Sequence, residues 1–140
     1  TFDFLLTDGS GAAQANAYGT GCDGLTLTTT GVPAIGNTSF SLEVNNVTIP
    51  AAFVGFGTTV VNPGVDLTAV GMAGCFGYTT LNIGLFATAT VAGGTGSFAL
   101  SMPNCPILVG SSFSTQGIAL SGATTLGVAS SNGVELVIGF

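Results

Sequence analysis

Few side chains in this sequence could take part in acid–base or nucleophilic chemistry. The 140 residues include six carboxylates, two tyrosines and three cysteines, and they contain no Lys, Arg or His. A nucleophilic serine or cysteine needs a base beside it, so Ser-His-Asp, Cys-His and Ser-Lys arrangements cannot be built from this chain. The carboxylates are best explained as solvated acids that keep an apolar protein dispersed: Asp3, Asp8, Asp23, Glu43, Asp66 and Glu135.

Two catalytic alternatives use residues that are present. Glycoside hydrolysis needs two facing carboxylates, and Glu43 and Glu135 occupy outward positions of predicted strands from which they could face each other. Thr1 could act as an N-terminal nucleophile with its own amine as the base. Cleavage of an export signal in front of a β-strand explains Thr1 more simply. We therefore expect no catalytic residue and no enzyme.

Calcium is the metal that best suits these carboxylates, because acids without basic partners face either water or a cation. The stretches TDGSG and CDGL each supply one Asp beside Gly, far short of the ligand pattern of an EF-hand. Transition metals need clustered His or Cys, which the sequence does not offer. We expect no metal and no cofactor.

A sugar-binding site would use aromatic platforms beside polar side chains. The sequence offers Tyr18, Tyr78 and ten Phe but no Trp, and Phe at alternating positions is typical of a strand core.

The sequence also contains candidate attachment sites for glycans. Asn37-Thr38-Ser39 and Asn46-Val47-Thr48 fit the N-glycosylation pattern, so Asn37 and Asn46 are the candidate acceptors.

The charge balance excludes several partners. Without cations the chain cannot neutralise phosphates, which excludes nucleic-acid binding and attraction to anionic membrane surfaces. No apolar run approaches the ~20 residues of a membrane-spanning helix, so we expect no membrane insertion. A start at Thr1 without Met fits a mature product after removal of an export signal. We expect a secreted protein, extracellular or on the cell surface.

The three cysteines agree with an oxidising compartment. A pair between Cys22 and Cys75 would close a loop of about 50 residues and contribute about 4 kcal/mol in the chain-entropy model. Cys105 would then be a small buried thiol or a link to a neighbouring subunit, and re-pairing among the three cysteines is the remaining alternative.

Short strands account for most of the pattern. Apolar residues alternate in SFSLEVNNVTI, in SFALSMP and in VELVIGF, whereas no helix-period stretch of useful length occurs. Asn132-Gly133 and Gly93-Gly94 suit two-residue hairpins, and Pro63-Gly64 marks a further reversal. About eight strands result, which predicts an all-β fold with one β-sandwich or jelly-roll-like domain over residues 18–140.

Five stretches follow one another from Tyr18 onward: YGTGC, GVPAIGNTSFSLEV, VDLTAVGMAGC, SFALSMPNCPILVGSSFSTQGIAL and LGVASSNGVELVIG. In this order they resemble a β-module of secreted proteins of planctomycetes and related bacteria, which runs from YGxGC through a second Gly-Cys to SNxxxxxIG. The resemblance implies a secreted β-domain whose two cysteines are Cys22 and Cys75. It assigns no catalytic residues and no role to Cys105, which lies where the pattern usually has an acidic residue.

Residues 1–17 lie ahead of this pattern and read as a strand with a flexible leader. Phe2, Phe4 and Leu6 alternate with other residues as in a strand, and the small or polar residues of GSGAAQANA reach up to ~30 Å when extended. An apolar strand leaves backbone groups unpaired in water unless it joins a sheet edge. We expect it to dock on its own domain or, as a donor strand, on another copy of the chain.

Head-to-tail strand addition does not close on itself and produces filaments. The sequence therefore predicts a non-catalytic extracellular structural protein that self-assembles into a filament or surface layer. Phe2, Phe4 and Leu6 form its assembly arm, its partner is itself, and glycans are a further partner. The alternative function is a secreted carbohydrate-binding or adhesive β-sandwich module that acts as a monomer.

Overall fold

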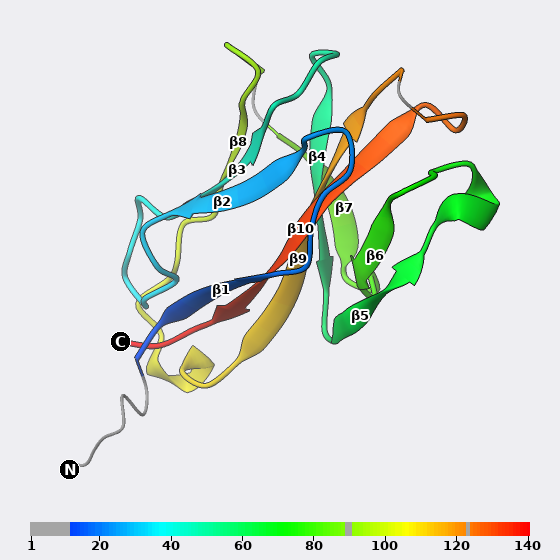
Figure 1. Ribbon diagram of the computed structural model, residues 1–140. Coiled ribbons are helices and arrows are strands. Elements are labelled where there is room, and N and C mark those ends of the chain that lie inside the picture. Colours follow the sequence, from blue (N-terminus) through cyan, green and yellow to red (C-terminus); the bar gives the residue numbers. More distant parts are fainter. Residues whose placement is uncertain (1–11, 89–90, 123) are drawn as a thin grey trace.

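The computed structural model describes residues 12–88, 91–122 and 124–140, and these fold into β-strands and two one-turn 3-10 helices (Figure 1). The elements are β1 (Gln14–Tyr18), β2 (Thr26–Thr30), β3 (Ser41–Asn45), β4 (Ala52–Gly57), β5 (Val60–Asp66), η1 (Thr68–Val70), β6 (Phe76–Thr79), β7 (Gly84–Ala87), β8 (Gly96–Ala99), η2 (Pro106–Leu108), β9 (Ser112–Leu120) and β10 (Val128–Val137).

The strands form three antiparallel sheets. A five-stranded sheet with the order β1-β10-β9-β4-β7 lies between a three-stranded sheet, β2-β3-β8, and a two-stranded sheet, β5-β6 (Figure 1). Strands β2 and β3 pack over β10, β9 and β4, and β6 packs over the opposite face of β9 and β10. The predicted all-β, sandwich-like fold is confirmed.

The apolar core fills the space between the five-stranded and three-stranded sheets. Leu42 and Val44 of β3 have no exposed surface, and they belong to the same buried cluster as Val134 and Leu136 of β10, which are 2% and 1% exposed. The sheets come close together at Gly117 of β9, where a Cβ atom would lie 3.0 Å from the side chain of Val44. Alternation along β3 and β10 thus places the apolar half of each strand in one core.

The other face of the five-stranded sheet is polar where β5 and β6 cover it. Gln116 of β9 is 3% exposed, and the nitrogen and oxygen of its side-chain amide both form hydrogen bonds to the β5-β6 sheet. Its Nε2 donates to the carbonyl oxygens of Phe76 (2.6 Å) and Ser131 (2.8 Å), and its Oε1 accepts from the N–H of Tyr78 (2.9 Å). Because this amide is fully hydrogen-bonded, its burial carries no penalty for an unpaired polar group.

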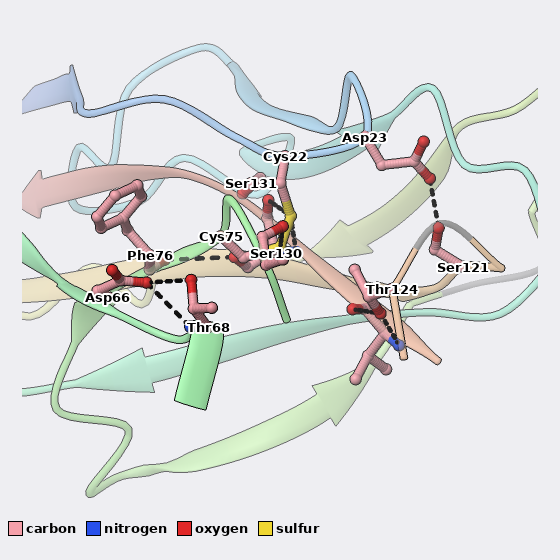
Figure 2. The surroundings of a disulfide bond; sticks show 12 residues. Cys22, Asp23, Asp66, Thr68, Cys75, Phe76, Ser121, Thr124, Ser130 and Ser131 are labelled. Carbon is pink, nitrogen blue, oxygen red and sulfur yellow. Dashed lines mark hydrogen bonds between the residues drawn. A yellow bond between two sulfur atoms is a disulfide. The ribbon is translucent and has the colours of Figure 1, made fainter. Parts of the chain in front are cut away.

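A disulfide between Cys22 and Cys75 joins these two layers covalently, with 5.0 Å between the Cα atoms (Figure 2). The pairing implied by the sequence resemblance is confirmed. Cys22 also lies against β10, where its N–H donates to the carbonyl of Ser130 (2.9 Å). Cys105 is a free, partly exposed thiol at the start of η2.

Two of the predicted turns are wrong. Asn132-Gly133 is not a hairpin, because β10 runs through it with a register shift against β9 between Ser130 and Gly133. The bulge turns the Asn132 side chain toward β2, where it accepts from the N–H of Leu27 (2.9 Å) and donates to its carbonyl (3.2 Å). Pro63-Gly64 likewise lies within β5, after a cis Asn62-Pro63 bond.

Gly93-Gly94 does form a turn, with both residues at positive φ (61° and 81°). The strands on either side of it, β7 and β8, do not pair with each other. They belong to the five-stranded and the three-stranded sheet, respectively.

Part of the segment predicted as a flexible leader is a strand. Gln14–Tyr18 form β1, an edge strand paired with β10 from Gln14↔Val137 to Tyr18↔Gly133. The ordered domain therefore begins before residue 18, because the small residues of this segment fit beside β10. Residues 1–11 lie outside the described part of the chain.

Removing the disulfide should lower stability without changing the fold. Cys22 and Cys75 are 53 residues apart, so the chain-entropy model gives a loss of about 4 kcal/mol for the double variant Cys22→Ala/Cys75→Ala. Urea denaturation measures this loss. The matched control Cys105→Ala removes a partly exposed thiol and should change the free energy of unfolding by less than ~1 kcal/mol. Equal losses in the two variants would contradict the structural role of the disulfide.

Candidate assembly interface

Three phenylalanines gather at the side of the sandwich where β7 and β8 are the last strands of their sheets. The ring centroid of Phe56 (β4) is 5.6 Å from that of Phe86 (β7) and 5.6 Å from that of Phe98 (β8). Phe86 and Phe98 stack across the two sheets at 5.9 Å. The rings therefore bridge the gap between the sheets at this side.

These rings line an open cleft of about 260 Å³. Every residue that lines it is apolar, and the full set is Phe56, Ile83, Phe86, Phe98, Leu100 and Phe113. For comparison, an apolar cavity of about 150 Å³ is large enough to bind benzene. The cleft is thus large enough for one aromatic ring from outside.

The cleft is open because the three-stranded sheet ends at β8, and no further described strand pairs with β8 to lie over β7. Strand β8 packs over β4, one strand short of the edge of the five-stranded sheet. Phe86 pairs with Val54, so it points to the core side of its sheet, yet it remains 43% exposed. Ile83, just before β7, is 44% exposed. Large apolar side chains that face a core and still meet solvent make this cleft a candidate interaction site.

Among the described residues, both strands that border the cleft have one edge without a strand partner. The N–H of Thr88 donates to Ala52 (3.0 Å), so alternation along β7 directs the backbone groups of Leu85 and Ala87 away from β4. The N–H of Leu100 donates to Phe40 (3.0 Å), which likewise directs those of Ser97 and Ala99 away from β3. Proteins usually protect such edges with Lys, Pro or a bulge. Neither GLFA of β7 nor GSFA of β8 contains a charge or a proline.

The opposite edge of the five-stranded sheet differs. Strand β1 places only Ala15 and Ala17 on the core side, opposite Leu136 and Val134. Alanine leaves no large apolar surface there. Of the two edges of the five-stranded sheet, the β7 edge is therefore the one where large apolar side chains of the core face are exposed.

The predicted arm residues Phe2, Phe4 and Leu6 lie outside the described residues, as do Thr1, Asp3 and Asp8. The sequence pattern does not reveal the cleft, since the alternation in SFALSMP assigns Phe98 to a core face. Only the pairing of the sheets shows that this part of the core is uncovered.

The carboxylates in the described part of the chain do not gather at the cleft. Leu42 and Val44 face the core, so Glu43 between them faces outward from the three-stranded sheet. By the same alternation Glu135 faces away from that core, on the other side of the five-stranded sheet. The two glutamates therefore do not face each other, and the predicted alternative of a carboxylate pair is wrong.

The remaining described acids have local partners (Figure 2). Ser121 donates its hydroxyl to Asp23, and Thr68 donates its hydroxyl (2.6 Å) and its N–H (2.9 Å) to Asp66. The two hydrogen bonds from Thr68 lower the pKa of Asp66. Within residues 12–88, 91–122 and 124–140, no group of three His, Cys, Asp or Glu side chains could hold a metal ion.

Both candidate glycosylation sites lie at the surface, at turns. Asn37 donates to the carbonyl of Val32 (2.9 Å) and accepts from the N–H of Ser39 (2.9 Å). Asn46 is exposed at a positive φ of 65° and donates to the carbonyl of Gly24 (2.8 Å). Neither residue lines the cleft.

The two tyrosines pack against each other away from the cleft. Their rings are 5.6 Å apart, edge to face, and the Tyr18 hydroxyl donates to the carbonyl of Tyr78 (2.6 Å). Gly133 makes room for this arrangement, because a Cβ there would lie 2.4 Å from the Tyr18 ring. Burial, with smaller contributions from Glu135 and Tyr78, raises the pKa of Tyr18 to about 12. The two rings therefore hold β1 against β6.

Comparison with protein-family models, curated protein sequences and solved structures found no significant match. Among the helices of the described segments, none has the length and apolar character required to cross a membrane. The resemblance to the secreted β-module therefore stays a prediction.

The Tyr18 environment predicts a loss of stability at high pH. The ordinary tyrosine pKa of 10.0 applies to the unfolded chain, and the pKa of Tyr18 in the folded chain is about 12. The unfolded state therefore loses this proton first, so stability is full below about pH 10 and falls as pH rises toward 12. We expect a fall of about 1–2 kcal/mol, reduced from the full shift because the side chain is partly exposed.

Urea denaturation at several pH values, with tyrosinate absorbance as a second readout, measures the effect. Tyr18→Phe should be less stable than the wild type near pH 8, where it lacks the hydrogen bond to Tyr78, and should lose less between pH 10 and 12. An unchanged slope in Tyr18→Phe would show that other groups cause the alkaline loss.

Proposed function

We propose that this protein is a non-catalytic extracellular structural protein whose copies assemble by strand addition. The segment that carries Phe2, Phe4 and Leu6 adds to the sandwich of the next copy, and repetition produces a filament or a surface layer. The observation that carries the proposal is the apolar cleft, lined by six apolar side chains and bordered by two free strand edges.

The arm and the cleft match in chemistry. In an extended strand, Phe2, Phe4 and Leu6 point to the same side, so one face of the arm is wholly apolar. The cleft offers only apolar surface, and its neighbouring strand edges offer unpaired N–H and C=O groups. Strand addition satisfies both, because the backbone supplies hydrogen bonds and alternate side chains fill pockets.

Chain length favours a neighbouring copy over the same copy. The described chain enters the sheet at β1, and the cleft lies beside β7 at the opposite edge. Four strand spacings of ~4.8 Å and the ~10 Å between sheets separate the two places by roughly 22 Å. The residues between Thr7 and Gln14 reach at most ~25 Å when fully straight. The reach of these residues therefore hardly exceeds the distance to the cleft of the same copy, whereas the cleft of another copy is not limited to that distance.

Composition supports burial of one copy against another. With no Lys or Arg, contacting surfaces lose little side-chain entropy and few cations are desolvated. The disulfide is compatible with a secreted protein. Head-to-tail contacts of this kind do not close, so they extend into fibres.

Deletion of residues 1–8 tests the proposal directly. The variant should remain a folded monomer, with the thermal unfolding of a single domain, while the full chain assembles. Sedimentation and negative-stain microscopy of the two proteins give the result. Polymers of the deleted chain would refute the role of the arm, and a monomeric full chain that binds a glycan array would favour the carbohydrate-binding alternative.

A matched pair of substitutions tests which face of the arm is buried. Phe4→Asp places a carboxylate in an apolar cleft of a chain without cations, which costs several kcal/mol and should abolish assembly. Leu5→Asp changes the neighbouring residue, which points away from the cleft in the same strand, and should leave assembly within a few-fold of the wild type. Equal losses would contradict a one-sided, strand-like arm.

A further inference from the structure

We propose that the acceptor is the free edge of β8, so that the arm becomes the fourth strand of the three-stranded sheet and lies over β7. This inference rests on the proposed function and names its acceptor. Two edges border the cleft, and an arm could add to either β7 or β8. The two edges differ in what an added strand would face: a strand beside β8 would face β7, whereas a strand beside β7 would face solvent.

An arm beside β7 would add a strand to the five-stranded sheet, which already extends past the three-stranded sheet that covers it. The three-stranded sheet ends at β8, over β4, so a strand added beyond β7 would have nothing facing its inner side. Its phenylalanines would point into solvent past Phe86. Backbone hydrogen bonds would form, but the apolar side chains would gain little burial.

An arm beside β8 would lie directly over β7. One strand spacing of ~4.8 Å from β8 brings its inner face above Phe86 and Ile83, the two exposed apolar residues of the cleft. Phe98 and Leu100 of the β8 segment point to the same inner side and form the near wall of the cleft. The fourth strand thus covers the exposed rings and leaves the sandwich with matched edges.

The backbone of β8 is also available for this pairing. The outward groups of Ser97 and Ala99 make no hydrogen bond among the described residues, and β3 is the only strand partner of β8 there. Ala99 is exposed at the end of this edge, whereas Gly96 at its start is buried beside Thr88 and Val91. The arm would therefore find two consecutive sites for antiparallel or parallel pairing.

Cysteine cross-linking between two different copies tests the acceptor. One copy carries Asp3→Cys or Leu5→Cys in the arm, and the other carries Ala99→Cys in β8 or the matched control Ala87→Cys in β7. Ala99 and Ala87 are both exposed alanines on outward faces, and all copies carry Cys105→Ser. Neighbouring strands place Cα atoms ~4.5–5.5 Å apart, which suits a disulfide.

Mild oxidation of the mixed, assembled copies should give a covalent dimer with Ala99→Cys at least ~10-fold more often than with Ala87→Cys. Preference for Ala87→Cys, or equal yields, would overturn the β8 acceptor while leaving strand addition in place. Absence of both cross-links would also overturn it if assembly still needs residues 1–8. If the chain deleted for residues 1–8 assembles normally, the proposed function itself fails.

Proline variants give an independent measurement. Ser97→Pro and Leu85→Pro each remove one outward N–H, from β8 and β7 respectively, and an edge strand tolerates proline at such a position. Ser97→Pro should reduce assembly at least ~10-fold and Leu85→Pro should not, with both variants unfolding at similar temperatures. The reverse order would overturn the inference.

Discussion

The apolar contact between the β2-β3-β8 sheet and the β1-β10-β9-β4-β7 sheet holds this domain together, and it is narrower than the larger of the two sheets. Strands β9, β10 and β4 are covered, while β7 extends past the cover with Phe86 partly in solvent. At the other edge the same mismatch exposes only the alanines of β1. The two edges therefore differ: the β7 edge exposes a phenylalanine of the core face, whereas the β1 edge has only alanines there.

The second face of β9 and β10 is covered through polar and covalent contacts instead of apolar ones. The β5-β6 layer is joined to the central sheet by the amide of Gln116, by hydroxyl contacts and by the Cys22–Cys75 disulfide. A chain without cations has no ion pairs to use between its side chains, so amides, hydroxyls and a covalent bond link its layers. Because both faces of β9 and β10 are covered, an added strand could pair only at an edge of the sandwich.

The same lack of charge explains why that margin stays open. Lysines and prolines that normally keep edge strands from pairing are missing from β7 and β8. In a protein that acts alone this would be an aggregation hazard. In a subunit that takes a strand from its neighbour, an unprotected edge beside an apolar cleft is what assembly requires.

Period-2 alternation was enough to predict the all-β class and the buried faces of Ser41–Asn45 and of the C-terminal strand, because burial of every second residue is a local property. The hairpin at Asn132-Gly133 could not be judged locally, since the bulge depends on a bond to Leu27, over a hundred residues away. The cleft was hidden for the same reason. Sequence alone determined which side chains are apolar, that Lys, Arg and His are missing, and that a segment with alternating phenylalanines precedes the domain. Only the tertiary structure decided which strand lacks a cover, because the width of each sheet is set by pairing between distant segments.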